Sequence, residues 1–248
     1  MRVVTWNLWW RFGPWEARRK AILSVLRELR PDVVGLQEVW ECDGENIAAW
    51  IADELGLHWT WAPSETPERW QRRIGGEKVD VGNAVLSRWP VVESEAMRLP
   101  APDELDDGRL ALYARLAAAP GHHVPFFTTH LTSAAHASEV RRQQVTALAE
   151  FVAKRRVGTA YPPVITGDFN AWPDSDEIRL FGGYKTAPAV PGQVPGFGPS
   201  ARIDYVFVGP PGRGGLGHVR KVERAGHGAV DGIWPSDHAA VVADLASA

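Results

Sequence analysis

The stretch Thr166-Gly167-Asp168-Phe169-Asn170 decides how the rest of the chain is interpreted. The residues before it, 162–165, form a short apolar run bounded by prolines, which predicts a buried strand. The residues after it are typical of a turn that leads to a helix N-cap at Ser175. We therefore expect Asp168 and Asn170 at the carboxyl end of a strand, where they can hold a water or a metal ion. Taken alone, the two residues can equally be ordinary turn formers.

Composition limits the classes of protein to consider. The chain has 248 residues, of which 45% are hydrophobic, and a formal net charge of -3. This length predicts a single domain over residues 1–248. The charge argues against a general nucleic-acid binder but leaves local basic patches open. The single cysteine, Cys42, can form no internal disulfide. With no signal-peptide pattern and no membrane-spanning run, we expect a cytoplasmic monomer without a membrane anchor.

Short apolar runs alternate with a few helical patterns along the chain. Apolar residues at helical spacing predict helices over 16–29, 46–55 and 139–155, with the arginines of the first helix on its polar face. Strands are expected at 2–7, 33–38, 58–61, 79–87, 91–99, 109–116, 124–130, 203–208, 216–225 and 239–245. This pattern predicts a four-layer α/β sandwich, in which two mixed, mainly antiparallel sheets pack face to face with helices outside.

Three segments are expected to be loops. Residues 182–200 are rich in Gly and Pro. Residues 63–78 are polar, and the loop they form either is solvated or faces the substrate. The aromatic loop 8–14 and the residue after it leave three alternatives open: packing against the following helix, stacking on bases or insertion into a lipid interface. The aromatic residues concerned are Trp9, Trp10, Phe12 and Trp15.

Residues that bind metals or move protons recur where the apolar strands end. Any one of them alone is more often structural, as a helix cap or a buried hydrogen-bond donor. As a set, their carboxylates and amides are oxygen ligands suited to Mg²⁺ or Mn²⁺, whereas one cysteine and scattered histidines argue against structural zinc. Phosphate-loop, nucleophile-elbow and dinucleotide motifs are absent from the sequence, which leaves metal-assisted attack of water on a phosphate ester. The set comprises Asn7, Glu38, Asn83, His130, Asp168, Asn170, Asp204, Asp237 and His238.

These motifs, in this order, resemble the endonuclease/exonuclease/phosphatase superfamily. That superfamily includes DNase I-like nucleases, tyrosyl-DNA phosphodiesterases, deadenylases, neutral sphingomyelinases and inositol-polyphosphate 5-phosphatases. The resemblance implies the same four-layer sandwich and a Mg²⁺- or Mn²⁺-dependent hydrolase. The matching stretches are Thr5-Trp6-Asn7, Leu36-Gln37-Glu38-Val39, Gly82-Asn83-Ala84-Val85-Leu86-Ser87-Arg88, Thr129-His130-Leu131, Gly167-Asp168-Phe169-Asn170, Arg202-Ile203-Asp204-Tyr205-Val206 and Ser236-Asp237-His238.

The resemblance implies a metal site and a base. Glu38 is similar to the family's main metal carboxylate, with Asn7 beside it, and Asp237 resembles an additional metal ligand. Asp168 resembles the residue that orients or deprotonates the attacking water. Asn170 resembles the amide that holds this water or the scissile phosphate.

The resemblance also implies residues that face the substrate. Asp204 resembles the carboxylate that orients His238, which would then be protonated and stabilise charge on the phosphoryl oxygens. His130 resembles a phosphate-contacting histidine. Asn83 and Arg109 are similar to substrate-side residues of the family.

The sequence leaves the phosphate ester open. We expect a phosphodiesterase or nuclease acting on DNA or RNA, because the chain has the compact length of nucleases and a local strip of Arg69, Arg72, Arg73 and Lys78. A phosphomonoesterase and a sphingomyelinase-type phospholipid hydrolase are the alternatives on the same fold. A non-catalytic scaffold is a further alternative, and its expected signature, a missing acid or terminal histidine, is not seen.

Overall fold

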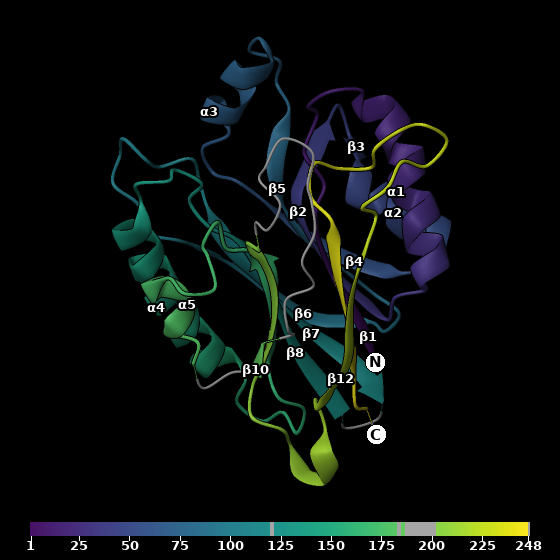
Figure 1. The fold of residues 1–248 in the computed structure, drawn as a ribbon, viewed down its shortest axis with the longest axis vertical. Coiled ribbons are helices and arrows are strands. Elements are labelled where there is room, and N and C mark those ends of the chain that lie inside the picture. Colours follow the sequence, from purple (N-terminus) through teal and green to yellow (C-terminus); the bar gives the residue numbers. More distant parts are fainter. Residues whose placement is uncertain (120–121, 183–184, 187–201, 248) are drawn as a thin grey trace.

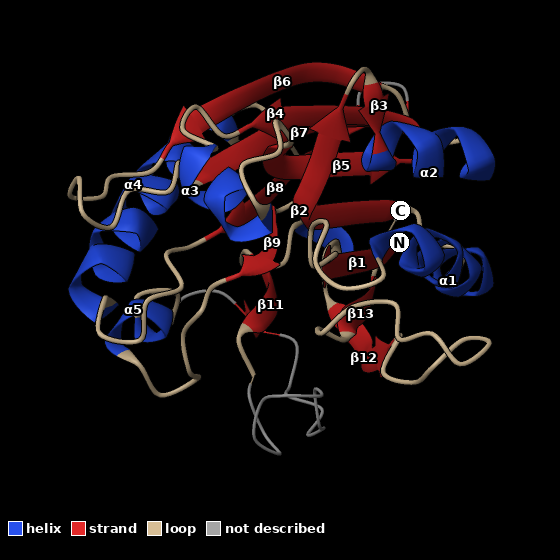
Figure 2. Cartoon of the chain, turned by 90° about the horizontal axis from the view of Figure 1, so that it is seen from above, coloured by secondary structure: helices blue, strands red, loops and turns tan. Residues whose placement is uncertain are grey.

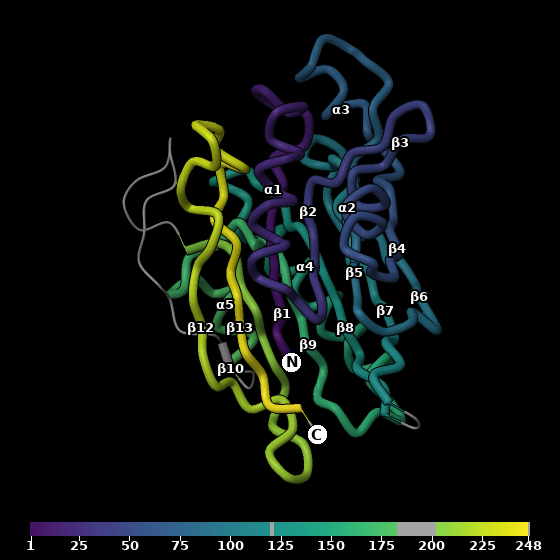
Figure 3. The backbone as a smooth tube through the Cα atoms, turned by 90° about the vertical axis from the view of Figure 1, so that its right-hand side faces the viewer, coloured from purple at the N-terminus to yellow at the C-terminus, as the bar shows by residue number. Residues whose placement is uncertain are grey.

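The computed structural model describes residues 1–119, 122–182, 185–186 and 202–247, so most of the predicted loop 182–200 lies outside the described residues. The chain forms two β-sheets with helices on the outer sides, and its first and last described residues lie at the same end of the molecule (Figures 1 and 3). The Met1 amino group donates a hydrogen bond to the carbonyl oxygen of Leu245 at 2.7 Å, which ties the two ends together.

The first sheet has the strand order β12-β13-β1-β2-β5-β4, and the short β3 pairs with β2. β1 and β2 run parallel, and the other neighbouring strands run antiparallel. Both faces of this sheet are largely covered, and most residues of β1 and β2 are buried, including polar ones such as Thr5 and Gln37. The strands are β1 (Arg2–Asn7), β2 (Val33–Cys42), β3 (Glu45–Asn46), β4 (His58–Pro63), β5 (Asp80–Ser87), β12 (Val219–Ala225) and β13 (Ala240–Leu245).

The second sheet has the order β10-β11-β9-β8-β7-β6. It repeats the plan of the first, because β8 and β9 are parallel and the other pairs are antiparallel. The strands are β6 (Val91–Arg98), β7 (Leu110–Ala119), β8 (His122–His130), β9 (Val164–Asp168), β10 (Lys185–Thr186) and β11 (Asp204–Val208).

Helices cover the outer faces of the two sheets (Figure 2). Helices α1 and α2 lie on one side of the sandwich and α4 and α5 on the other. None of the helices in the described part of the chain is long and apolar enough to cross a membrane. The helices are α1 (Trp15–Leu29), α2 (Ile47–Leu55), α3 (Glu68–Gln71), α4 (Ser138–Arg155) and α5 (Asp176–Arg179), with 3₁₀ turns η1 (Arg72–Ile74) and η2 (Arg213–Gly215).

Three hydrophobic clusters separate the four layers. The central cluster lies between the sheets and includes Val33 of β2 and Phe126 of β8. A second cluster joins the first sheet to α1 and α2, and includes Ile22. A third joins the second sheet to α4, and includes Leu148. The four-layer sandwich expected from the sequence is therefore confirmed.

Two local predictions need correction. The loop predicted at 63–78 contains α3 and η1, and its Trp70 is only 4% exposed. Arg18, expected on the polar face of the first helix, is 1% exposed. Its guanidinium donates to five backbone carbonyl oxygens, those of Leu8, Trp9, Trp10, Phe12 and Pro235. Arg18 is buried because the aromatic loop folds over the start of α1.

The aromatic loop packs against the protein. Trp10 is 1% exposed and makes an edge contact with Trp70, with 5.7 Å between the ring centroids. Phe12 and Trp15 are partly buried against the cluster under α1 and α2. Of the three alternatives for this loop, these contacts favour packing.

The topology brings the predicted polar residues to one end of the sandwich. The parallel strands β1, β8 and β9 end at Asn7, His130 and Asp168. Glu38, predicted at the end of a strand over 33–38, lies inside β2, which continues to Cys42. The antiparallel strand β11 starts at the same edge, because Asp204 is opposite Asp168 in the register. Strand β13 begins just after His238.

Candidate active site

An amide on β1 links the two sheets at this edge. Asn7 Nδ2 donates to Glu38 Oε1 at 3.1 Å and to Asp168 Oδ2 at 3.0 Å. Asn7 Oδ1 in turn accepts a hydrogen bond from the backbone N–H of Trp9 at 2.9 Å, which fixes the orientation of the amide. All three linked side chains are buried. The two carboxylates are therefore held at a fixed separation by one side chain.

Glu38 lies on an irregularity of β2. Between Leu36 and Val39 the register shifts, so that two β2 residues face the single β5 residue Asn83. Such a bulge re-aims a side chain, and Glu38 adopts a φ of 54°, a conformation that is strained for a non-glycine residue. The bulge thus turns the Glu38 carboxylate toward the edge.

The Glu38 carboxylate is not fully satisfied. Its Oε2 is buried and has no hydrogen-bond partner among the described residues. Burial raises the pKa of Glu38 to about 7; the hydrogen bond from Asn7 opposes this rise, and the negative charge of Asp237 adds to it. A free oxygen beside a second acid is a position that a cation would stabilise.

The turn after β9 fixes Asp168. Asp168 Oδ1 accepts a hydrogen bond from the backbone N–H of Asn170 at 2.9 Å, and Asn170 has a φ of 47°. Asn170 Nδ2 donates to the carbonyl oxygen of Leu131 at 3.0 Å. The predicted strand-end position of both residues is confirmed, and Asp168 is held through both of its oxygens.

His238 faces three acids. Its Nδ1 lies 2.8 Å from Asp204 Oδ2, and its Nε2 lies 3.8 Å from Asp168 Oδ2. Burial by itself would lower the pKa of His238, but the charges of Asp204, Asp168 and Asp237 outweigh it and raise the pKa well above its usual value. The proton shared by the pair therefore stays on the imidazole.

The segment around His238 is tied to β1. Ser236 Oγ donates to the carbonyl oxygen of Asn7 at 2.6 Å and accepts from the backbone N–H of His238 at 3.1 Å. Trp6 Nε1 donates to the His238 carbonyl oxygen at 2.9 Å. Burial raises the pKa of Asp237, which lies in the same segment.

His130 has different neighbours. Its Nε2 lies 3.4 Å from Asp168 Oδ2, and its ring makes an edge contact with Trp70 at a centroid distance of 6.1 Å. Burial, with the positive charge of Arg109, lowers the pKa of His130 well below its usual value. His130 is therefore neutral at physiological pH.

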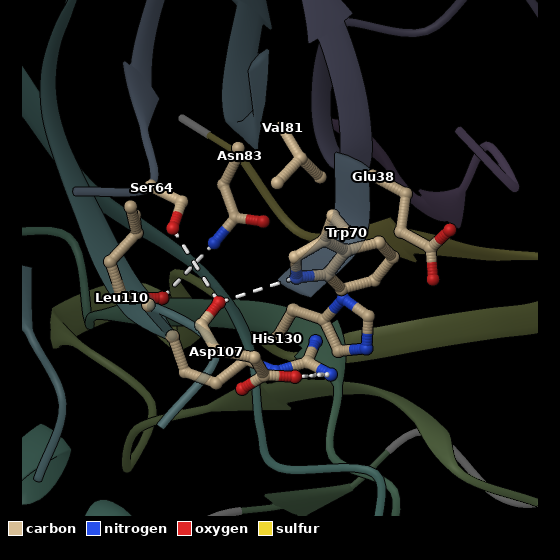
Figure 4. A pocket seen from close by; sticks show the side chains of 11 residues that line it. Glu38, Ser64, Trp70, Val81, Asn83, Asp107, Leu110 and His130 are labelled. Carbon is tan, nitrogen blue, oxygen red and sulfur yellow. Dashed lines mark hydrogen bonds and ion pairs between the residues drawn. The ribbon is translucent and has the colours of Figure 1, made fainter. Parts of the chain in front are cut away.

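A pocket beside this edge contains the two predicted substrate-side residues (Figure 4). Asn83 Nδ2 donates to the carbonyl oxygen of Leu110 at 3.0 Å. Arg109 makes a two-pronged ion pair with Asp107, at 2.8 Å through Nε and 2.7 Å through Nη2. Other lining residues include Glu38, Ser64, Trp70, Val81 and His130.

The structure offers a second group of metal-ligand atoms. One ligand atom from each of Asp168, Asp204 and His238 lies within 4.8 Å of the others, an arrangement that can hold a metal ion. The sequence had instead suggested Glu38, Asn7 and Asp237. All six residues lie at the same edge of the sandwich.

Sequence reasoning missed three residues that shape the site: Arg18, Trp70 and Ser236. The only signal for Trp70 was a lone aromatic residue in a polar segment. Nothing in the sequence marks Arg18, because its burial depends on how the aromatic loop folds back over the start of α1 and on a contact with the distant Pro235. Ser236 was part of a recognised motif, but its bond to the β1 backbone could not be foreseen.

The four-layer sandwich and its edge of acids, amides and histidines define a phosphoesterase. Residues 4–238 match the Endonuclease/Exonuclease/phosphatase family, and the chain belongs to this family. A comparison of the sequence with curated proteins found no match.

Solved structures share the fold at low identity. The human Nocturnin catalytic domain with bound sulfate anion is 22% identical, with a TM-score of 0.78 over 99% of this chain and 94% of that chain. D. rerio TDP2 complexed with single strand DNA product is 16% identical, with a TM-score of 0.76 over 100% and 99%. The mannosyl-6-phosphatase of Bacteroides thetaiotaomicron VPI-5482 is 19% identical, with a TM-score of 0.70 over 100% of both chains.

Proposed function

We propose that this protein is a Mg²⁺- or Mn²⁺-dependent phosphodiesterase that cleaves nucleic acid by in-line attack of water. The observation that carries the proposal is the double hydrogen bond of Asn7, which holds Glu38 and Asp168 together. In this proposal, Glu38 binds the cation and Asp168 accepts the proton of the attacking water.

Glu38, with Asn7 and Asp237 beside it, fits a metal ion. The Glu38 Oε2 atom is buried without a partner among the described residues, and the nearby charge of Asp237 raises the pKa of Glu38 further. A bound ion supplies positive charge that polarises the phosphate and stabilises the leaving oxygen. We assign His238 to another role, because Asp204 already occupies its Nδ1.

Asp168 is the base in this proposal. Its two oxygens accept from Asn7 and from the Asn170 backbone, so the carboxylate is held in one orientation. It takes the proton of the attacking water as the water bonds to phosphorus and the ester bond on the opposite side breaks. The Asn170 amide, fixed by its bond to Leu131, positions the water or the scissile phosphate.

The two histidines bind the phosphoryl group. His238, kept protonated by Asp204, donates from Nε2 to a phosphoryl oxygen as negative charge builds there. Neutral His130 contributes one N–H donor to the same group. No covalent intermediate is needed.

Two substrate classes have support. Nucleic acid is favoured by the arginines around the pocket and by the likeness to a TDP2 structure that contains a single strand DNA product. A phosphomonoester is the second candidate, since the mannosyl-6-phosphatase has the same fold.

The test is hydrolysis of labelled oligonucleotides: a single strand, a duplex, a duplex with an abasic site and a strand with a blocked 5′ end. Each is incubated with Mg²⁺, with Mn²⁺ and with EDTA. We expect metal-dependent cleavage, and a loss of about a thousandfold in Asp168→Asn because the base is gone. The exposed Asp174, in the same loop, gives the matched control Asp174→Asn, which should keep its activity.

Two outcomes would contradict the proposal. Near-normal cleavage by Asp168→Asn would remove Asp168 from the base role. Failure of the wild-type protein to cleave any of the four oligonucleotides, together with metal-dependent release of phosphate from sugar monophosphates, would replace the nuclease with a phosphomonoesterase.

A further inference from the structure

An arginine-rich arm lies next to the candidate active site. Helix α3 and turn η1 carry Arg69, Arg72 and Arg73, and these three line a surface groove with Trp70 and Asp107. Trp70 and Asp107 also line the pocket that contains Glu38 and His130. Trp70 and Asp107 therefore lie between the groove and the pocket. In Figure 1 the arm projects at the end of the sandwich opposite the chain termini.

Aromatic and cation–π contacts around Trp70 connect the arm to the site. The Arg73 guanidinium lies 5.1 Å from the Trp70 ring centroid and 4.5 Å from that of Phe12. The Arg109 guanidinium lies 5.0 Å from the Trp70 ring, and the His130 ring touches Trp70 from the pocket side (Figure 4). Cation–π contacts of this kind hold a guanidinium in place without neutralising its charge. Arg73 is therefore a positioned positive charge near His130.

The charges of Arg72 and Arg73 are not neutralised by acids. Among the described residues, neither Arg72 nor Arg73 forms an ion pair, and both are exposed. Arg69 donates to the backbone carbonyl oxygens of Asp103 and Glu104 rather than to a carboxylate. The neighbouring Arg109, by contrast, is paired with Asp107. Arg72 and Arg73 are thus two exposed positive charges available to an anion on one side of Trp70. The half-buried Arg69 lies beside them, and its charge also acts on Asp106.

We propose that Arg69, Arg72 and Arg73 bind a second phosphate of the substrate, in the strand next to the phosphate that is cleaved. This rests on the proposed function and makes it more specific, because the preferred substrate then has at least two phosphates. Guanidinium groups suit this task, since their planar fork can bind two phosphate oxygens at once.

The experiment compares two thymidine oligonucleotides that differ in length and therefore in the number of phosphates. Thymidine dinucleotide has one phosphate and thymidine tetranucleotide has three. The quantity measured is the kcat/KM of the tetranucleotide divided by that of the dinucleotide. We expect this ratio to fall about tenfold in Arg72→Ala/Arg73→Ala, because two charged contacts to phosphate are lost. The dependence of the tetranucleotide kcat/KM on salt should also become less steep, by about one to two in the logarithmic slope.

Two exposed arginines at the other end of the molecule give a matched control. Arg213 lies in η2 and Arg220 in β12, and the charge of Arg220 acts on the Met1 amino group. Arg213→Ala/Arg220→Ala makes the same change in net charge and should leave the ratio unchanged. An equal fall of the ratio in this control would overturn the proposal, because the ratio would then depend on the net charge of the protein and not on the position of the arginines.

The remaining outcomes separate this proposal from the proposed function. Wild-type protein that hydrolyses neither the thymidine oligonucleotides nor bis(p-nitrophenyl) phosphate would refute the phosphodiesterase itself. Metal-dependent hydrolysis with an unchanged ratio in Arg72→Ala/Arg73→Ala would overturn only the second phosphate site. If the double variant does not fold, Arg72→Ala alone should lower the ratio about threefold, since one surface charge is lost. An unchanged ratio there would also overturn the proposal.

Discussion

The two histidines of the site are both buried and both lie near Asp168 Oδ2, His130 at 3.4 Å and His238 at 3.8 Å, yet their other charged neighbours are opposite in sign. His238 lies 2.8 Å from Asp204 and has Asp168 and Asp237 nearby, and its pKa is raised. His130 is affected by the positive charges of Arg109 and Arg73, and burial and these charges lower its pKa. Burial favours the neutral form of both rings, so the neighbouring charges decide which histidine keeps its proton.

This difference divides the site into an acidic half and a cationic half. The acidic half consists of Glu38, Asp168, Asp204, Asp237 and the protonated His238. The cationic half consists of Arg109, the neutral His130 and the arginines of α3 and η1. Under the proposed function, a phosphate ester placed between them would meet a side that holds the metal and accepts the proton on one face and positive charges on the other. In the proposed mechanism, bond breaking depends on the acidic half, and substrate binding depends more on the cationic half.

The largest expected effect is that of Asp204→Asn, which would break the contrast between the histidines. Without the carboxylate at 2.8 Å, the pKa of His238 should fall, and the imidazolium would be lost at neutral pH. We expect kcat to drop about a thousandfold, as for loss of a donor that stabilises charge in the transition state. NMR titration of His238 and steady-state kinetics measure the two effects.

Asp244 provides the control for that variant. It is also an acid in an ion pair, with Arg2 at 2.9 Å, but it lies at the opposite end of the sandwich. Asp244→Asn should leave kcat unchanged. An unaltered His238 pKa in Asp204→Asn would show that Asp204 does not keep that histidine protonated.

Glu38→Gln tests the acidic half through stability. The folded-state pKa of Glu38 is about 7, above the usual 4.5, so ionised Glu38 destabilises the metal-free protein above pH 7 and this cost disappears as pH falls toward 4.5. In EDTA at pH 8, Glu38→Gln should therefore be more stable than the wild type by about 3 kcal/mol, and at pH 4.5 by much less.

The same variant should lose its response to metal. Mg²⁺ or Mn²⁺ should raise the melting temperature of the wild type and not that of Glu38→Gln, because an amide replaces the carboxylate ligand. Urea unfolding at the two pH values and thermal melting with and without metal are the measurements. If Glu38→Gln is instead less stable than the wild type at pH 8 in EDTA, then the ionised Glu38 carboxylate does not destabilise the metal-free protein, and this prediction is wrong.

Much of this division could be anticipated from the sequence. The apolar runs that end in Asn7, His130 and Asp168 predicted the strand ends correctly, because hydrophobic periodicity persists over whole strands. Glu38 was expected at the end of its strand and instead lies inside β2, which continues to Cys42. The sequence did not reveal why these ends meet. They meet because each sheet contains one parallel pair, β1 with β2 and β8 with β9, which depends on contacts between distant segments.

The parts that could not be predicted are local exceptions to the pattern. The bulge that turns Glu38 is a one-residue register shift without a sequence signature. Helix α3 has four residues, too few to show helical periodicity. Arg18 has helical spacing typical of the exposed face, and it is buried only because backbone carbonyl groups of the aromatic loop and of Pro235 surround it. The cationic half depends on α3, so it was less visible in the sequence than the acidic half.

The smallest effect is expected from Arg109→Met, which tests whether the cationic half binds rather than reacts. Methionine keeps an apolar contact with Trp70 but removes the charge that helps to lower the pKa of His130. We expect that pKa to rise toward its usual value, and KM to increase about tenfold, because one charged contact to phosphate is lost, with a much smaller change in kcat. Because this variant leaves Asp107 unpaired, Arg109→Met/Asp107→Asn serves as the charge-matched comparison. A fall in kcat as large as that of Asp204→Asn, at unchanged KM, would place Arg109 in the reaction itself and remove the distinction between the two halves.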